Sequence, residues 1–204
     1  MLRMTTRRKF IGRAVAVGAA TMTATMMSPA ISAALGEDAN IPARLTLERV
    51  LFDERFDAAR LFAAEAESRG ATTTAINGSI HDLWYTDLYH RWREGRSPIA
   101  GITDFRSLFL LEMMAADAGM KVVHRVHHHA GNGARSHRIF GPLARRVELQ
   151  DRFSVAQDHW AQCAADIVTS WPAQSALSAN HRSDIASAAM QQLDAETLIS
   201  WIIS

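Results

Sequence analysis

The stretch that decides the fold is Pro98-Ile-Ala-Gly-Ile-Thr103, the run from Asp104 to Gly119 that follows it, and Lys121-Val-Val-His-Arg-Val-His127. The first and last of these segments are short and rich in apolar or β-branched residues, which is typical of buried strands. The segment between them has the length of a helix and carries apolar side chains on nearly every side. A helix of that kind must be covered on most sides. We therefore predict that the whole segment, 98–129, lies near the centre of an α/β domain.

The same alternation of strands and helices extends towards the N-terminus. The patterns predict strands at 47–52 and 72–76, a helix at 55–69, and a second helix that begins at Ser79 and ends before Gly95. Only a few residues connect each element to the next. Such alternation favours a single three-layer domain, with a mainly parallel sheet flanked by helices on both sides.

The pattern changes in the C-terminal third of the chain. Residues 136–140 fit a short strand that forms a hairpin with the strand beginning at Lys121. A long helix is predicted at about 144–170, a weaker one at 181–193, and a final β-branched strand at 197–203. We therefore expect a C-terminal helical extension on the α/β domain.

Composition and charge limit the kinds of partner. The chain has 204 residues, of which 48% are hydrophobic, which suits one domain with a substantial core. Residues 1–34 hold five basic and no acidic groups, which leaves 17 Lys and Arg against 21 Asp and Glu in the remainder, a net charge of −4. The remainder therefore gives no electrostatic argument for nucleic acid. Cys163 is the single cysteine, so an intrachain disulfide is excluded.

The N-terminus contains the motif Thr6-Arg7-Arg8-Lys9-Phe10-Ile11-Gly12. A mildly apolar run follows at 14–27, too short and too polar for a membrane span, and small residues suited to peptidase cleavage follow at 28–34. These features resemble the twin-arginine export signal, with matches at Thr6, Arg7, Arg8 and Phe10, Ile11 in place of Leu, and Gly12 where Lys is common.

The resemblance implies a domain division and a location. Residues 1–34 are expected to be the signal peptide, 35–46 a linker and 47–204 the exported domain. The twin-arginine translocase is the implied partner, and it carries proteins that have already folded. The resemblance also implies a periplasmic protein with no stable membrane span after processing, which in many cases travels with a co-exported enzyme.

A histidine-rich segment is the first candidate site. If residues 125–129 are extended, His127 and His129 project from the same face about 7 Å apart, because a strand rises ~3.3 Å per residue. His137 returns across the predicted hairpin as a third candidate ligand. Imidazole ligands favour Zn²⁺ or Cu²⁺, so these three residues form a candidate metal site. The alternative is a set of solvated or singly hydrogen-bonded histidines.

The ends of the predicted strands form the second candidate site. Ligands of open parallel sheets bind beyond the carboxyl ends of the strands, where the following helix N-termini favour anionic oxygen. The residues at these positions are Asp53, Gly78, Ser79, Thr103, Asp104 and His127. The carboxylate of Asp104 would oppose an anion, and ordinary helix capping is the alternative for each turn.

No nucleotide-binding glycine motif, serine-nucleophile elbow or HExxH sequence occurs. We therefore expect an exported protein that binds a small ligand or metal, or that assists a co-exported enzyme. The alternative is a periplasmic enzyme, a hydrolase or an oxidoreductase, with its site at the strand ends. An enzyme should show a deep pocket with perturbed titratable groups, whereas an accessory protein should show an exposed apolar patch.

Overall fold

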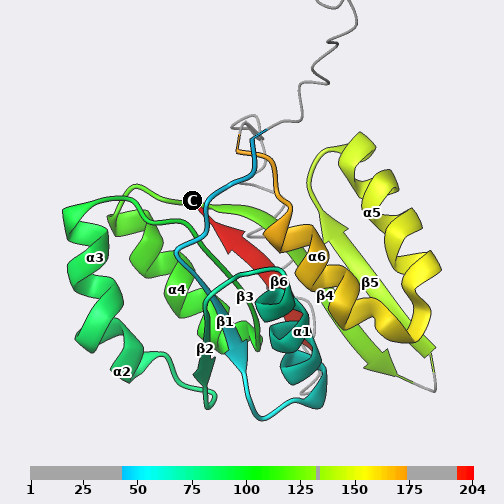
Figure 1. The fold of residues 1–204 in the computed structure, drawn as a ribbon, viewed down its shortest axis with the longest axis horizontal. Coiled ribbons are helices and arrows are strands. Elements are labelled where there is room, and N and C mark those ends of the chain that lie inside the picture. Colours follow the sequence, from blue (N-terminus) through cyan, green and yellow to red (C-terminus); the bar gives the residue numbers. More distant parts are fainter. Residues whose placement is uncertain (1–42, 132–133, 174–196) are drawn as a thin grey trace, which may run out of the picture. The chain divides into compact units, whose positions relative to one another are not determined.

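The computed structural model describes residues 43–131, 134–173 and 197–204 (Figure 1). The predicted signal peptide with Arg7, Arg8 and Phe10, most of the linker, and the helix predicted at 181–193 lie outside these ranges. In the part of the chain that is described, no helix is both long enough and apolar enough to cross a bilayer.

The elements follow one another as an alternation of strands and helices, which confirms the predicted α/β class. In chain order they are β1 (Arg49–Asp53), α1 (Asp57–Ser68), β2 (Thr73–Ile76), α2 (His81–Leu83), the π-helical segment η1 (Trp84–Leu88), α3 (Tyr89–Glu94), β3 (Ile99–Thr103), α4 (Phe105–Asp117), β4 (Val122–Gly131), β5 (Ala134–Phe140), α5 (Leu143–Ala156), the 3-10 segment η2 (Gln157–His159), α6 (Trp160–Thr169) and β6 (Leu198–Ile203).

The six strands form one sheet in the order β2-β1-β3-β6-β4-β5. Strand β1 pairs in parallel with β2 and β3, whereas the β3–β6, β6–β4 and β4–β5 pairs are antiparallel. The prediction of a mainly parallel sheet was therefore wrong. The physical reason is β6, whose six residues are all buried and which inserts between β3 and β4 instead of adding to an edge.

Strand direction across the sheet is nevertheless shared by the first four strands. Because β4 is antiparallel to β6 and β6 is antiparallel to β3, β4 runs in the same direction as β1, β2 and β3. The carboxyl ends of β1 to β4 therefore meet one edge of the sheet, as the strand-end hypothesis requires.

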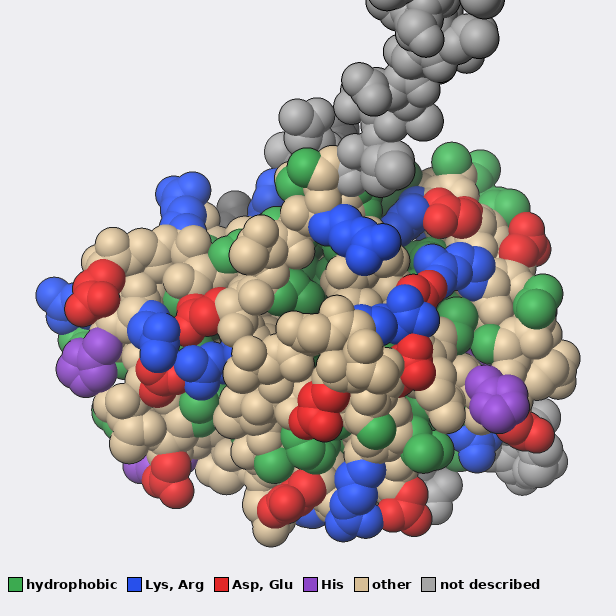
Figure 2. Space-filling model, in the orientation of Figure 1, with side chains coloured by type: hydrophobic (Ala, Val, Ile, Leu, Met, Phe, Trp, Pro, Cys, Tyr) green, Lys and Arg blue, Asp and Glu red, His purple; other side chains and the backbone are tan. Residues whose placement is uncertain are grey.

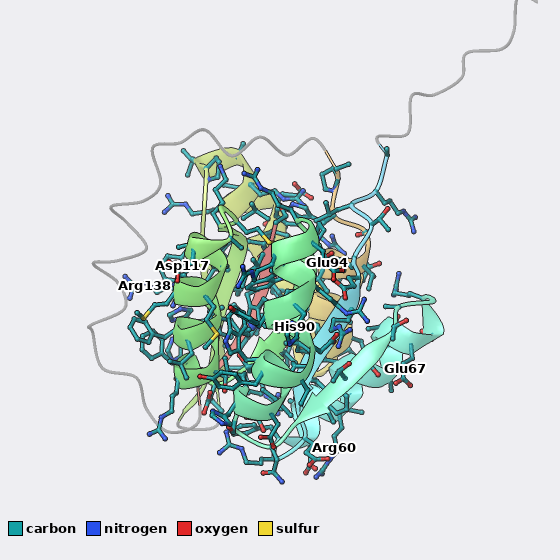
Figure 3. The ribbon with its side chains drawn as sticks, turned by 90° about the vertical axis from the view of Figure 1, so that its left-hand side faces the viewer. Arg60, Glu67, His90, Glu94, Asp117 and Arg138 are labelled. Carbon is teal, nitrogen blue, oxygen red and sulfur yellow. The ribbon has the colours of Figure 1, made fainter. Side chains whose placement is uncertain are left out.

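Two hydrophobic clusters cover the two faces of the sheet. One packs α1, α5 and α6 against residues such as Val50, Val126 and Ile202. The other packs α3 and α4 against residues such as Leu51 and Trp201. Figure 3 shows α3 and α4 running next to each other over that second face. The described domain is therefore built of three layers.

The segment predicted to be central, 98–129, is only partly so. Strand β3 is buried at all five positions and lies with β6 in the middle of the sheet. Helix α4 lies on one face, where it buries the side that includes Leu108 and Leu111, while Phe109, Leu110 and Met113 are exposed. A sheet covers only the side of a helix that faces it, and the described residues place no further layer over α4.

The long helix predicted at 144–170 is divided into α5 and α6. The break occurs at Gln157, which adopts a positive φ of 49°, a conformation that an α-helix does not contain. The break allows α6 to turn against α1 and to place Trp160 near the carboxyl end of β4 (Figure 1).

Candidate functional site

One half of the strand edge, at β1, β2 and β3, is filled by the side chain of Arg55. Its Nε and Nη2 donate to the two carboxylate oxygens of buried Asp53 at 2.9 and 2.5 Å. Nη2 also donates to Asp104 Oδ2 at 3.0 Å. The hydrogen bond to Asp53 is the largest cause of a raised pKa of the Arg55 guanidinium. A Cβ atom on Gly78 would lie 2.2 Å from Arg55 Cζ, so the space above Gly78 is already occupied.

The other residues predicted for this half serve local structure. Ser79 Oγ accepts from His81 N, and Thr103 Oγ1 accepts from Trp201 Nε1 at 3.0 Å. Asp104 Oδ1 accepts from Ser107 N at 2.8 Å and caps α4. The structure brings Asp53, Gly78 and Asp104 together around Arg55, but none of the six residues predicted at the strand ends lines the cavity described next.

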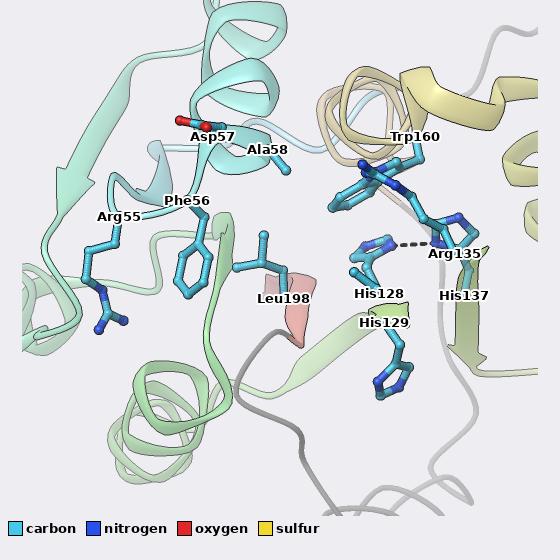
Figure 4. A pocket seen from close by; sticks show the side chains of 11 residues that line it. Arg55, Phe56, Asp57, Ala58, His128, His129, Arg135, His137, Trp160 and Leu198 are labelled. Atoms are coloured by element: carbon cyan, nitrogen blue, oxygen red, sulfur yellow. Dashed lines mark hydrogen bonds between the residues drawn. The ribbon is translucent and has the colours of Figure 1, made fainter. Parts of the chain in front are cut away.

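The other half of the edge, at the carboxyl end of β4, opens into a cavity of about 380 Å³ (Figure 4). It lies between the start of α1, the start of β6 and the start of α6. Figure 4 shows Phe56 and Leu198 on one side, with Trp160, Arg135 and the histidines on the other. Its lining consists of Arg55, Phe56, Asp57, Ala58, His128, His129, Ala130, Arg135, His137, Trp160 and Leu198. We call this cavity the edge pocket.

A chain of hydrogen bonds runs from the sheet interior into the edge pocket. Ser200 Oγ is 2.9 Å from His128 Nε2, and His128 Nδ1 is 2.8 Å from His137 Nδ1. The His128 ring lies against Trp160 at 4.5 Å between centroids, and the His137 ring stacks on Phe153 at 4.6 Å. The aromatic rings therefore fix both imidazoles in place.

Burial keeps these histidines uncharged. It is the main cause that lowers the pKa of His128 well below the ordinary value, and it also lowers the pKa of His137. The adjacent charge of Arg135 lowers the pKa of His137 further. At neutral pH both rings therefore offer one donor and one acceptor nitrogen each.

Ser200 and His128 have the spacing of a serine nucleophile and its base, with His137 in the position of a third, orienting group. However, Ser200 is fully buried and does not line the edge pocket. A ligand in the pocket has no access to its hydroxyl, so the arrangement does not support nucleophilic catalysis by Ser200.

The predicted metal ligands are divided between the two faces of β4. His127 and His129 share one face, with ring centroids 6.1 Å apart, as the strand period requires. His137 pairs with His128 on the opposite face. The three residues therefore do not converge, and no group of three or more His, Cys, Asp or Glu is arranged to hold a metal among the residues described.

The surroundings of His127 also disfavour a cation. Its Nε2 accepts a hydrogen bond from Arg125 Nε at 3.0 Å, so that lone pair is not free for a metal. Burial is the main cause that lowers the pKa of His127 to about 3, and the Arg125 charge adds to it. His129 is hydrogen-bonded through Nδ1 to Thr197 Oγ1 at 2.9 Å. The alternative of hydrogen-bonded histidines describes this face of β4.

Four residues that line the edge pocket were not predicted as site residues: His128, Arg135, Phe56 and Trp160. One sequence feature indicates the His128–His137 pair. Asn-Gly at 132–133 favours a two-residue hairpin loop, which aligns residues whose numbers sum to 265 and so pairs His128 with His137. The observed register from Arg125↔Phe140 to Gly131↔Ala134 follows this rule. Phe56 and Trp160 reach the edge pocket through the packing of α1 and α6, which no local sequence pattern predicts.

Comparisons of the chain with protein-family models, with curated proteins and with solved structures give no significant match.

Proposed function

We propose that this chain is an exported α/β protein that binds a small molecule in the edge pocket. The observation that carries the proposal is the cavity of about 380 Å³ at the carboxyl ends of like-directed strands. Its size falls within the range of roughly 300–1,000 Å³ that is common for small-molecule sites. It also combines aromatic walls with a few placed polar groups, which is the usual composition of such sites.

The contrast with the filled half of the edge supports the proposal. At β1 to β3 the polar groups are paired with one another, and Arg55 occupies the available space. At β4 the hydrogen-bond chain ends at His137, whose Nε2 has no partner among the described residues. A ligand in the edge pocket would supply that partner.

A binding experiment with a cavity-filling variant tests the proposal. The full chain is screened against a fragment library by NMR, with the Trp160 indole signal as the reporter inside the edge pocket. Ala58 lines the pocket in the first turn of α1, so Ala58→Leu should weaken binding by filling it. Ala64→Leu is the matched control, since Ala64 lies exposed on the same helix. Equal binding by both variants would contradict the proposed location.

Export through the twin-arginine translocase is proposed from the leader motif. Replacing Arg7 and Arg8 by Lys keeps the charge of the leader but removes its two planar guanidinium groups. Cell fractionation should then find the precursor in the cytoplasm, while Arg13→Lys should leave export unchanged. Undiminished periplasmic accumulation of the double variant would contradict the assignment. A co-exported enzyme stays a predicted partner.

A second candidate function is acid–base catalysis on the bound molecule. It is favoured by two histidines of lowered pKa that meet at the edge pocket, which is typical of sites that transfer protons. His137 is the residue at the pocket wall, and His128 orients it. Hydrolysis of p-nitrophenyl esters by the full chain, compared with the His137→Gln variant, tests this candidate. Equal rates for the two proteins would exclude His137 as an acid–base catalyst of that reaction.

A further inference from the structure

We infer that the edge pocket selects a small planar carboxylate, and that His137 Nε2–H donates a hydrogen bond to it. The inference rests on the proposed binding function and names the chemical class of the ligand. It follows from the direction of the hydrogen-bond chain, from the one unpaired cation in the described lining, and from the apolar walls.

The direction of the hydrogen bonds from Ser200 through His128 to His137 is fixed because Ser200 is buried. The Ser200 hydroxyl is fully buried, and His128 Nε2 is its hydrogen-bond partner at 2.9 Å among the described residues. If Ser200 accepted from His128, its own hydrogen would be buried without an acceptor, at a cost of about 1–3 kcal/mol. Ser200 therefore donates, and His128 Nε2 carries the lone pair.

The remaining protons follow from this first step. Neutral His128 must carry its proton on Nδ1, which donates to His137 Nδ1 at 2.8 Å. His137 accepts at Nδ1, so in its neutral form it carries its own proton on Nε2. The wall of the edge pocket at His137 therefore presents an N–H donor, which requires an acceptor on the ligand.

Arg135 gives this donor a charged neighbour. It lines the edge pocket, its guanidinium lies 5.7 Å from the Trp160 ring centroid, and it forms no ion pair with any residue that the structure describes. The other charged groups of the described lining are paired: Arg55 with Asp53 and Asp104, and Asp57 with Arg60 at 2.7 Å. The uncompensated charge in this part of the lining is positive and favours an anionic acceptor.

The opposite walls favour a planar apolar body. Phe56 and Leu198 face the histidines across the cavity, and Trp160 offers the face of its ring (Figure 4). The first residues of α1 also border the pocket, and no side chain caps that helix. Its N-terminal dipole adds to the preference for an anion. A small aromatic ring with one carboxylate matches all three features: the N–H donor of His137, the charge of Arg135 and the apolar side chains.

Three probes with the same ring test the charge preference. Benzoate, benzamide and benzylammonium are titrated into the full chain at neutral pH, with the Trp160 indole NMR signal as the readout. We expect benzoate to bind at least about tenfold more tightly than either other probe, since a charge-assisted hydrogen bond is worth roughly twice a neutral one. Equal or tighter binding of benzamide or benzylammonium, or no binding of benzoate, overturns the inference.

Two variants and one spectroscopic measurement assign the effect to the named residues. Arg135→Gln and His137→Phe should each weaken benzoate binding about five- to tenfold, while benzamide binding should change little under Arg135→Gln. Long-range ¹⁵N NMR of the imidazoles should show Nδ1–H on His128 and Nε2–H on His137. The reverse tautomers overturn the inference even if a ligand binds.

The outcomes separate this inference from the proposed function. If the fragment screen finds ligands that Ala58→Leu excludes, but benzoate does not bind, the binding function stands and the carboxylate inference fails. If no fragment binds in the edge pocket, the binding function itself fails. If Zn²⁺ binds stoichiometrically and removes the proton on His128 Nδ1, the imidazole pair is a metal site and the inference is overturned.

Discussion

The two halves of the strand edge have the same strand direction and opposite local chemistry. At β1, β2 and β3 a buried carboxylate holds Arg55 two residues later in the chain, and the guanidinium fills the space above Gly78. At β4 the residues are neutral imidazoles, aromatic rings and an arginine with no carboxylate partner among the residues described, and a cavity of about 380 Å³ stays open. We call these the closed half and the open half.

The comparison shows that topology alone does not make a binding site. Both halves lie where parallel strands commonly bind ligands. In the closed half Asp53, Arg55 and Asp104 are paired with one another, so these charged groups are not free to recognise a ligand. In the open half β6 starts at Leu198, whose apolar side chain lies with Phe56 on one side of the pocket, and the charged groups of the lining leave the cavity open.

The largest expected effect is a loss of stability in acid, which arises from histidines of β4, the strand of the open half, and not from the ion pairs of the closed half. Three histidines of β4 carry the largest shifts: burial lowers the pKa of His124 and of His127 to about 3 and that of His128 well below its ordinary value. In the unfolded chain the same residues titrate near 6.5. Between these values the unfolded state binds more protons, so the free energy of unfolding falls as pH falls, by about 1.4 kcal/mol per pH unit for each histidine.

Urea denaturation at pH 7, 6 and 5 measures this loss. With three histidines the expected decrease below pH 6.5 approaches about 4 kcal/mol per pH unit. The His124→Phe variant keeps a ring against Trp171 and should reduce the slope by about one third. A free energy of unfolding that does not change between pH 7 and pH 5 would show that these histidines are not held neutral.

Removal of the buried carboxylate should test whether the closed half is held by its ion pairs. Asp53→Ala removes the two Asp53 oxygens that accept from the Arg55 guanidinium and an acceptor for the Arg55 backbone N–H, and it leaves only the bond to Asp104. We expect a loss of about 2–4 kcal/mol in the free energy of unfolding, below the full value for a buried pair because Arg55 is 42% exposed.

The matched control for this variant is Asp57→Ala in the same loop region. The Asp57 side chain is 94% exposed and pairs with Arg60 on the surface. Its removal should cost less than about 1 kcal/mol. If the two variants lose equal stability, the buried Asp53–Arg55 pair contributes no more to the free energy of unfolding than an exposed ion pair does.

A glycine series should give the smallest and most local effect. Gly78→Ala combines a positive φ of 67° with a Cβ that meets the Arg55 guanidinium, so we expect a loss of about 1–3 kcal/mol. Gly70→Ala has a positive φ of 85° and open space, which isolates the backbone strain at about 1 kcal/mol. Gly95→Ala has extended backbone and open space and should be neutral within about 0.5 kcal/mol. Equal losses at Gly78 and Gly70 would mean that Arg55 moves aside at no cost.

Local patterns in the sequence predicted the elements but not their order in the sheet. The β-branched run at 197–203 indicated a strand, which β6 confirms. Its insertion between β3 and β4 depends on long-range pairing, which no local pattern encodes. The apolar residues of α4 predicted a helix covered on most sides, yet Phe109 and Met113 are exposed, because hydrophobic composition does not specify which sides are covered.

For the candidate site, the sequence predicted a ligand at the strand edge where the edge pocket lies, but other residues line that pocket. The strand period placed His127 and His129 on one face, which the structure bears out. Arg55 occupies the predicted cleft because its long side chain reaches Asp104 and the space above Gly78. No local sequence pattern specifies where such a side chain lies. The His128–His137 pair could have been predicted from the Asn-Gly loop, because that loop fixes the register of the hairpin.

The position of β6 has a consequence for how the domain assembles. Its partners lie far away in the chain, as the pair Ile99↔Ile203 illustrates, so the middle of the sheet has a high contact order and should form slowly. Until residues 198–203 are in place, β2-β1-β3 and β4-β5 are two separate ribbons with open edges. Leu198, the first residue of that last strand, lines the edge pocket. We therefore expect the edge pocket to be complete only once β6 closes the sheet, so a ligand of the proposed kind should bind the closed sheet and not its two separate parts.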